Sequence, residues 1–308
     1  MKIAIIGAGN VGGLLAMRLI EKDIADVVLI DIVKNLATAK VFDIKDEANV
    51  ARFNHKIEST DDISQVKVAS IIVITAGQTR KPGMTREDLL RNNAKTITEI
   101  SKSLKNVIDK KTIIIVVSNP VDLMTHLVYK ETGVSPRSIL GMGGSLDASR
   151  FANIVAEELN VLPRFVNTMV IGSHGESMVV LSRYTFVEGK PLVDLLPADR
   201  INSLIEKTKT RGAELVSLYG AGSAYFAPSL TTLSLIEAIV ADDRKKVVGC
   251  CAYLDGEYGL KDIFIGVPVN LWHQGVYRIV QLDLDEEELT ALHKSVDSIR
   301  SEINNLTI

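Results

Sequence analysis

The 308-residue chain has little of what disulfide frameworks and metal centres need. Its only cysteines, Cys250 and Cys251, are adjacent and lie within an apolar run. Adjacent cysteines do not form an ordinary disulfide framework, and no cysteine or histidine spacing typical of a metal site accompanies them. Because free cysteine behaves as a small hydrophobic residue, we expect two buried strand residues and no bound metal.

An excess of one charge and long apolar segments are also missing. Lysine and arginine number 35, and aspartate and glutamate 38, so the net charge of −3 favours neither nucleic acid nor a membrane surface as a partner. No apolar run reaches membrane-spanning length. The first strand pattern begins at Lys2, with no signal segment before it. These absences predict a cytoplasmic protein.

The first half of the chain alternates apolar runs with helical patterns. The runs are rich in β-branched residues and nearly continuous, which is typical of strands buried on both faces of a parallel sheet. They cover 3–6, 27–30, 71–74 and 113–117, and the helical patterns cover 12–22, 33–47 and 85–107. This alternation predicts an α/β fold with a doubly wound parallel sheet.

The second half has a different pattern, which predicts an α+β domain. Helical patterns cover 147–159, 197–217 and 229–241, and a last amphipathic helix begins near 289. A hairpin signal lies at 188–191, and antiparallel strands are expected over 247–254, 263–271 and 276–282. We therefore predict a nucleotide-binding domain at 1–145 and a substrate domain at 146–308, with no long linker between them.

A glycine-rich turn joins the first strand pattern to the first helix. Its G-x-G-x-x-G motif consists of Gly7, Ala8, Gly9, Asn10, Val11 and Gly12. Such a turn brings backbone N–H groups and a helix N-terminus to a diphosphate. Asp31 ends the second strand pattern, about 20 residues further on, where a carboxylate binds a ribose diol and repels a 2′-phosphate. The sequence thus predicts a Rossmann domain that binds NAD rather than NADP, the alternative being a structural turn with a capping aspartate.

Further polar residues follow other strand patterns. Asn119 ends one of them, at the edge where open α/β sheets bind ligands, although a plain turn is the alternative. The segment 80–86 places Arg80 and Arg86 on either side of a Pro-Gly turn. Arginine binds a carboxylate through two parallel N–H bonds. Two arginines on one loop favour a substrate with several anionic or polarised oxygens over a merely solvated basic loop.

His174 differs from the other histidines because glycines flank it, in Gly172-Ser173-His174-Gly175. Histidine titrates near neutrality and suits proton transfer to or from a carbinol oxygen. Its second nitrogen needs an acceptor that fixes the tautomer, and Asp147 is the candidate, with a helix N-cap as its alternative role. Arg150 follows three residues later, so both side chains can face one side of a helix.

Together these motifs resemble the lactate/malate dehydrogenase superfamily, over essentially the whole chain and most closely its lactate-dehydrogenase-like malate dehydrogenase group. The matching segments are 7–12, Asp31, 75–77, 80–86, 93–94, 118–120, 146–150 and 172–175. The resemblance implies NAD as the cofactor, bound by 7–12, Asp31, Thr75, Gly77, Asn93, Val117 and Asn119. It further implies His174 as proton donor and acceptor, oriented by Asp147. Substrate contacts are implied for Arg80, Arg86, Arg150 and Asn119, with Arg86 polarising the reacting carbonyl.

Arg80 favours malate/oxaloacetate over lactate/pyruvate as the substrate pair. In the lactate enzymes of this family, glutamine is the closest alternative at this position. A buried arginine there would face the methyl group of lactate or pyruvate, and its charge would be uncompensated. A lactate or other 2-hydroxy-acid dehydrogenase remains the alternative. A non-catalytic NAD-binding protein and an NAD-dependent glycoside hydrolase are more remote, since the latter needs a cysteine where Ser118 stands. The resemblance also implies a homodimer or homotetramer, with a subunit contact near 41–50.

Overall fold

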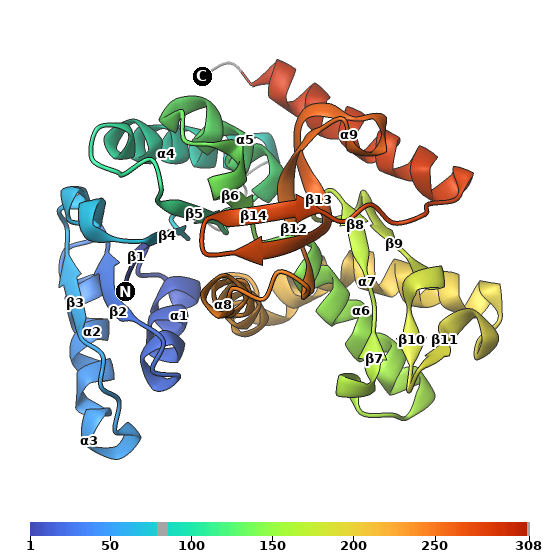
Figure 1. The fold of residues 1–308 in the computed structure, drawn as a ribbon. Helices are drawn as coiled ribbons and strands as arrows, with labels where there is room; N and C mark the ends of the chain where they lie inside the picture. The colour runs from blue at the N-terminus through green and yellow to red at the C-terminus, as the bar shows by residue number, and fades with distance from the viewer. Residues whose placement is uncertain (79–85, 307–308) are drawn as a thin grey trace.

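A single mixed sheet runs through the molecule and carries both halves of the chain (Figure 1). The computed structural model describes residues 1–78 and 86–306. Within them, the 11-stranded sheet has the order β3-β2-β1-β4-β5-β6-β12-β13-β8-β9, and β14 pairs with β13. The strands are β1 (Lys2–Ile6), β2 (Asp26–Ile30), β3 (Ile57–Thr60), β4 (Ile71–Ile74), β5 (Ile113–Val116), β6 (Ile139–Gly141), β8 (Val170–Gly172), β9 (Met178–Val180), β12 (Val247–Asp255), β13 (Lys261–Trp272) and β14 (Gly275–Ile279).

Helices cover this sheet on both faces, and a small second sheet lies at its far end (Figure 1). The helices are α1 (Asn10–Glu21), α2 (Leu36–Asp46), α3 (Ala48–Ala51), α4 (Arg86–Lys105), α5 (Val121–Thr132), α6 (Gly144–Leu159), α7 (Ala198–Tyr219), α8 (Phe226–Ala241) and α9 (Glu286–Asn305). The second sheet consists of β7 (Val166–Asn167), β10 (Phe186–Val187) and β11 (Lys190–Pro191). None of the helices in the described ranges is long and apolar enough to cross a membrane.

The apolar runs of the first half fill two cores, because successive Cβ atoms of a strand point to opposite faces of its sheet. In β1, Ile3 and Ile5 belong to the core under α1, α2 and α8, whereas Ala4 and Ile6 belong to the core under α4 and α5. Strands β2, β4 and β5 alternate in the same way. All five neighbouring pairs from β3 to β6 are parallel, which confirms the predicted doubly wound sheet.

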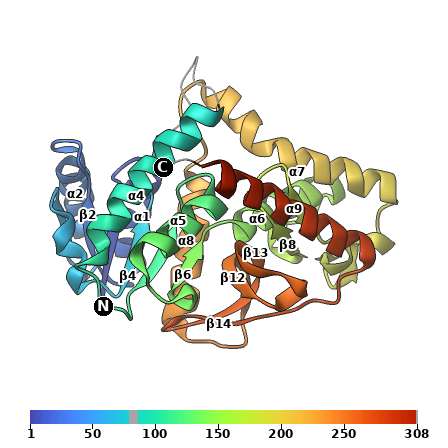
Figure 2. The same ribbon diagram turned by 90° about the horizontal axis from the view of Figure 1, so that it is seen from above.

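The second half continues the same sheet with antiparallel strands. Cys251 of β12 pairs with Gly141 of β6, and β13, β8 and β9 follow in antiparallel order. Seen from above, α7 and α9 run beside this half, and α4 and α5 lie beside the other (Figure 2). The helices α6 and α7 enclose a third core against the small sheet. The predicted α+β character of the second half is therefore confirmed.

Most predicted elements are present, and the exceptions have local causes. The helix predicted over 33–47 begins only at Leu36, because Asn35 adopts a left-handed conformation with φ 65°. Among the elements that had no prediction are the short strands β3, β6, β7 and β8 and the helices α3 and α5. Strand β3 has one buried residue, Ile57, so it lacks an apolar run. The predicted hairpin at 188–191 is the β10–β11 pair. The proposed boundary between 145 and 146 falls within α6.

Candidate active site

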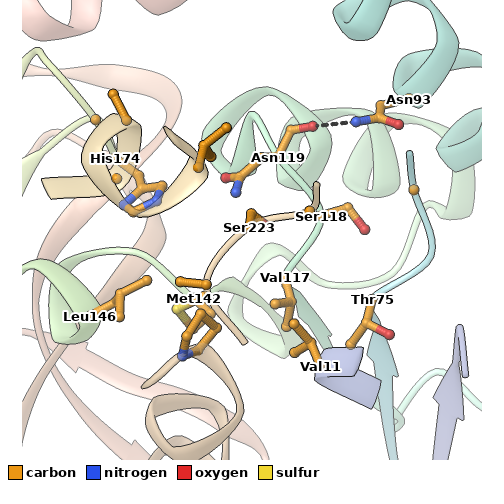
Figure 3. A pocket seen from close by; sticks show the side chains of 18 of the residues that line it. Val11, Thr75, Asn93, Val117, Ser118, Asn119, Met142, Leu146, His174 and Ser223 are labelled. Atoms are coloured by element: carbon orange, nitrogen blue, oxygen red, sulfur yellow. Dashed lines mark hydrogen bonds between the residues drawn. The ribbon is translucent and has the colours of Figure 1, made fainter. Parts of the chain in front are cut away.

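A cavity of about 370 Å³ is lined by residues from both halves of the chain (Figure 3). Its walls combine strand ends of the first half with the segment after β8 and with α6 and α7. The residues with a predicted role that line it are Val11, Thr75, Gly77, Asn93, Val117, Asn119, Arg150 and His174. The wall also includes Gly222 and Ser223, from the segment between α7 and α8. The fold thus gathers residues that are far apart in the sequence around one space.

His174 and Asp147 form a hydrogen-bonded pair at this cavity. His174 follows β8, Asp147 lies in the first turn of α6, and His174 Nδ1 is 2.7 Å from Asp147 Oδ2. The imidazole is 12% exposed and the carboxylate 1%. Since the carboxylate can only accept, Nδ1 carries the hydrogen and Nε2 is left for a substrate. The geometry is that of a histidine held in one tautomer by a buried carboxylate.

Opposing effects set the pKa of His174. Burial alone would lower it, because a desolvated imidazolium is unfavourable. The charge of Asp147 and its hydrogen bond act in the opposite direction, and the pKa of His174 lies above its usual value. Asp147 thus favours the protonated imidazole, which suits a group that accepts a proton from the substrate in one direction and returns it in the other.

Arg150 lies beside the same carboxylate and completes a cluster of three. Its Nη1 is 3.4 Å from Asp147 Oδ1, and its side chain is 13% exposed. Burial lowers the pKa of Arg150, and Asp147 partly offsets that effect. Gly212 of α7 lies beside the guanidinium, since a Cβ there would be in ordinary van der Waals contact with Arg150 Nη1, at 3.7 Å. A largely desolvated guanidinium facing a cavity is suited to a carboxylate ligand.

The glycines of the first turn have different structural reasons. A Cβ on Gly12 would overlap the Gly7 carbonyl oxygen, and a Cβ on Gly7 would come within 2.7 Å of Ala76 N. At Gly9, by contrast, nothing in the described residues lies within 4 Å of such a Cβ. The space over Gly9 is open, at the start of α1, where no side chain caps the helix. A diphosphate fits this place, because free N–H groups and the helix dipole favour an anion there.

Asp31 stands directly after β2 and is tied to that turn. Its Oδ2 accepts a 2.6 Å hydrogen bond from Ala8 N, and its Oδ1 accepts one of 2.8 Å from Val33 N. The carboxylate is therefore fixed beside the glycine turn but remains partly exposed. A ribose diol can donate to such a carboxylate, whereas a phosphate would be repelled. Together with the open space over Gly9, this arrangement fits NAD.

Two asparagines connect the strand ends near the cavity. Asn93 of α4 donates from Nδ2 to the Asn119 carbonyl oxygen at 2.9 Å, as Figure 3 shows, and its Oδ1 accepts from Gln78 N at 2.8 Å. Thr75, which directly follows β4, donates to the Gly7 carbonyl oxygen at 2.9 Å. These hydrogen bonds hold the segments that follow β1, β4 and β5, together with α4, in fixed positions beside the cavity.

The described residues do not cover every residue with a predicted role. Arg80 lies outside them, and Arg86 is described only as the first residue of α4. The structure adds two residues that no sequence pattern indicated. Lys40 of α2 donates from Nζ to the Gly9 carbonyl oxygen at 2.8 Å, and Asp122 of α5 accepts the backbone N–H of His174 at 2.9 Å. Both contacts join segments that are distant in the sequence, so no local pattern predicts them.

Comparison with known proteins assigns both halves of the chain. Residues 1–141 match the model of the lactate/malate dehydrogenase NAD binding domain, and residues 144–307 match that of the lactate/malate dehydrogenase alpha/beta C-terminal domain. The chain is 44% identical over 307 residues to a malate dehydrogenase of Dehalococcoides mccartyi, covering 100% of this chain and 99% of that protein.

Solved structures agree with this assignment. The apo malate dehydrogenase of Picrophilus torridus superposes with a TM-score of 0.93 at 39% identity, over 98% of this chain and 96% of that one. A lactate dehydrogenase of Cryptosporidium parvum, complexed with lactic acid and nicotinamide adenine dinucleotide, gives 0.94 at 31% identity, over 99% and 97%. The chain belongs to the lactate/malate dehydrogenase family.

Proposed function

We propose that this chain catalyses the reversible, NAD-dependent oxidation of (S)-malate to oxaloacetate. The observation that carries the proposal is the buried His174–Asp147 pair, 2.7 Å apart, at a cavity that adjoins the nucleotide turn. The relative from Dehalococcoides mccartyi, a malate dehydrogenase matched over its whole length, supports the choice of substrate. A lactate dehydrogenase shares the fold, so fold alone does not decide between the two substrates, and Arg80 supplies the chemical argument.

The chain's own residues move one proton and place the substrate. His174 Nε2 accepts the hydroxyl proton of malate, and in the reverse direction it returns that proton to the carbonyl oxygen of oxaloacetate. Asp147 stabilises the imidazolium that forms, because its carboxylate is fixed 2.7 Å from Nδ1. NAD, when bound, supplies the hydride acceptor. The described part of the cavity wall is mostly apolar, which strengthens the electrostatic contacts inside it.

Each arginine of the site binds a different polar group of the substrate. Arg150 is placed to bind the carboxylate next to the reacting carbon. The remaining assignments rest on family resemblance: Arg86 polarises the carbonyl, Arg80 binds the distal carboxylate, and Asn119 contacts both cofactor and substrate. Family resemblance also implies that the segment 77–86, most of which lies outside the described residues, closes over the bound substrate and excludes water. In this scheme residues 1–145 bind the nucleotide, residues 146–308 supply the proton relay, and the enzyme acts in the cytoplasm.

A homodimer or homotetramer is the assembly that the family resemblance favours. In the isolated chain, large apolar side chains are exposed on two surfaces. Phe42 and Val50, on α2 and α3, are 61% and 85% exposed, and Leu218 and Phe226, on α7 and α8, are 76% and 56% exposed. Exposed apolar surface of this kind is typical of protein contacts. A symmetric association would bury it, with the α2–α3 surface as part of the contact.

His174→Asn should nearly abolish turnover while NADH still binds. The variant removes the proton relay but not the nucleotide turn, and loss of a general acid–base typically lowers the rate by ~10²–10⁴-fold. The measurement is steady-state oxaloacetate reduction, together with NADH binding by fluorescence. His273→Asn is the control, because this histidine is 53% exposed and bonds to Asp242 at the surface. Wild-type turnover in the His174 variant would remove His174 from the mechanism.

NADH should be preferred to NADPH, because Asp31 loses a diol contact and meets a phosphate when NADPH binds. Hydrogen bonds to charged groups contribute about 1.5–3 kcal/mol, so we expect the ratio of kcat/KM to be on the order of 10- to 100-fold or more. Asp31→Ser should reduce this ratio of kcat/KM between NADH and NADPH. Equal kcat/KM for the two wild-type reactions would contradict the role of Asp31.

Arg80→Gln should narrow or reverse the preference for oxaloacetate over pyruvate. A site built to pair a polar group can reject an analogue that lacks it by ~10⁴–10⁵-fold, and glutamine removes the charge that penalises a methyl group. Arg86→Gln is the comparison, since it should lower kcat for both substrates. The measurement is kcat/KM for both 2-oxo acids in three proteins. If Arg80→Gln lowers both by one common factor, Arg80 does not set specificity.

The assembly prediction is tested by light scattering at micromolar concentration. Wild type should show the mass of a dimer or tetramer, and Phe42→Asp should reduce that mass, because a charge would be buried in the contact. Val193→Asp, at a side chain that is 47% exposed on another part of the surface, should leave it unchanged. A monomeric wild-type mass would count against the proposed association.

A further inference from the structure

A second carboxyl group contacts the catalytic histidine, at its backbone N–H rather than at its ring. Asp122 is in the first turn of α5, directly after the segment that carries Asn119. Its side chain is 1% exposed. Its Oδ2 accepts the backbone N–H of His174 at 2.9 Å. His174 is thus held at two points. Asp147 on α6 is hydrogen-bonded to its ring, and Asp122 on α5 accepts its backbone N–H. The two helices belong to opposite halves of the chain.

The surroundings of Asp122 suit a neutral carboxyl group better than a carboxylate. Its Oδ1 is fully buried and has no hydrogen-bond partner among residues 1–78 and 86–306. A buried carboxylate needs donors on both oxygens, whereas a carboxylic acid tolerates fewer. Burial raises the pKa of Asp122, although the His174 N–H, the Cys251 thiol, the charge of His174 and the Ser173 side chain act against it. The titratable groups that face it are His174 after β8 and Cys251 on β12.

Cys251 does not supply a compensating charge. Burial, followed by the nearby Asp122, raises the pKa of its thiol well above the usual value, so this neighbour stays neutral. Within residues 1–78 and 86–306, the cation that acts on Asp122 is the imidazolium of His174. Asp147 already holds that ring at 2.7 Å. A second carboxylate would raise the pKa of His174 further and make release of the transferred proton less favourable.

We propose that Asp122 is a positioning residue, which anchors the main chain of His174 as a neutral carboxylic acid. The inference rests on the proposed function, in which His174 transfers the proton. The two carboxyl groups beside this histidine then have different tasks. Asp147 is charged, fixes the tautomer and stabilises the imidazolium. Asp122 keeps the backbone of His174 in place and adds no charge to the relay.

Three variants test this division: Asp122→Asn, Asp122→Leu and Asp147→Asn. Asparagine keeps an oxygen acceptor for the His174 N–H and carries no charge, so it imitates a neutral acid. Leucine has the same branched shape but is larger and has no acceptor. The measurements are kcat and the pH profile of kcat/KM for oxaloacetate reduction, the dissociation constant of NADH, and circular dichroism as a check of folding. Asp147→Asn is the matched control, since it is the same substitution at the carboxylate that contacts the ring of His174.

Asp122→Asn should retain kcat within about threefold and leave the alkaline limb of the profile in place. Asp122→Leu should lower kcat by about tenfold or more with an unchanged NADH dissociation constant, and Asp147→Asn by ~10²-fold or more. His174 must be protonated to reduce oxaloacetate, so the rate falls as pH rises through its pKa. If Asp122 were charged, asparagine would lower that pKa and move the limb to lower pH. Such a shift, or wild-type kcat in Asp122→Leu, overturns the proposal.

An infrared measurement tests the protonation state without any substrate. At neutral pH the wild-type protein should show the carbonyl band of a protonated carboxyl group, and Asp122→Asn should lack it. Absence of that band in wild type overturns the neutral-acid proposal, even if Asp122→Leu fails to fold. A wild-type protein that does not reduce oxaloacetate would instead refute the proposed function. The two failures are therefore distinguishable.

Discussion

The close approach of β6 and β12 is the contact on which the site depends. Gly141 of β6 pairs with Cys251 of β12, and a Cβ on Gly141 would come within 2.9 Å of the Cβ of Cys251 and 2.5 Å of Thr125 Oγ1. Only a residue without a side chain fits between α5 and β12 at this place. The pairing extends the parallel sheet into the antiparallel half, so the segment after β8 meets the strand ends of the nucleotide half. Histidine and nucleotide turn then face one cavity.

Electrostatics at this cavity depend on which groups are buried and how each is paired. Arg150 and His174 share Asp147 as their anionic partner, at 3.4 and 2.7 Å. One carboxylate therefore faces two cations once His174 is protonated, and the cluster has positive charge to spare for an anionic substrate. Asp31, at the nucleotide turn, has a different task, because its partners are two backbone N–H groups and it remains partly exposed. Burial strengthens the contacts within the cluster of His174, Asp147 and Arg150 relative to water.

Local patterns were sufficient to predict the fold class, and they indicated several residues that the structure brings together at one cavity. The β-branched runs, the glycine turn and Asp31 each carry their signal within a few residues, and the structure places them as expected. The pair of His174 and Asp147 was predicted from chemistry, since a catalytic imidazole needs an acceptor, and the structure supplies the contact. Elements without a strong local pattern escaped prediction. Edge strand β3 buries only Ile57, and β6 is three residues long.

Asp122 shows why the remaining part of the site lies beyond sequence patterns. Asp122 and Asp147 are chemically identical and each lies in the first turn of a helix. Their difference comes from the folded surroundings: Asp147 has His174 and Arg150 as partners, whereas one oxygen of Asp122 meets no donor in the described part of the chain. A carboxyl group's charge follows from such partners. The groups involved lie on or next to α5, α6, β8 and β12. The charge of each carboxyl group therefore depends on how the fold brings these elements together. The pairing of β6 with β12, which shapes the cavity, therefore also determines which of the two carboxyl groups is charged.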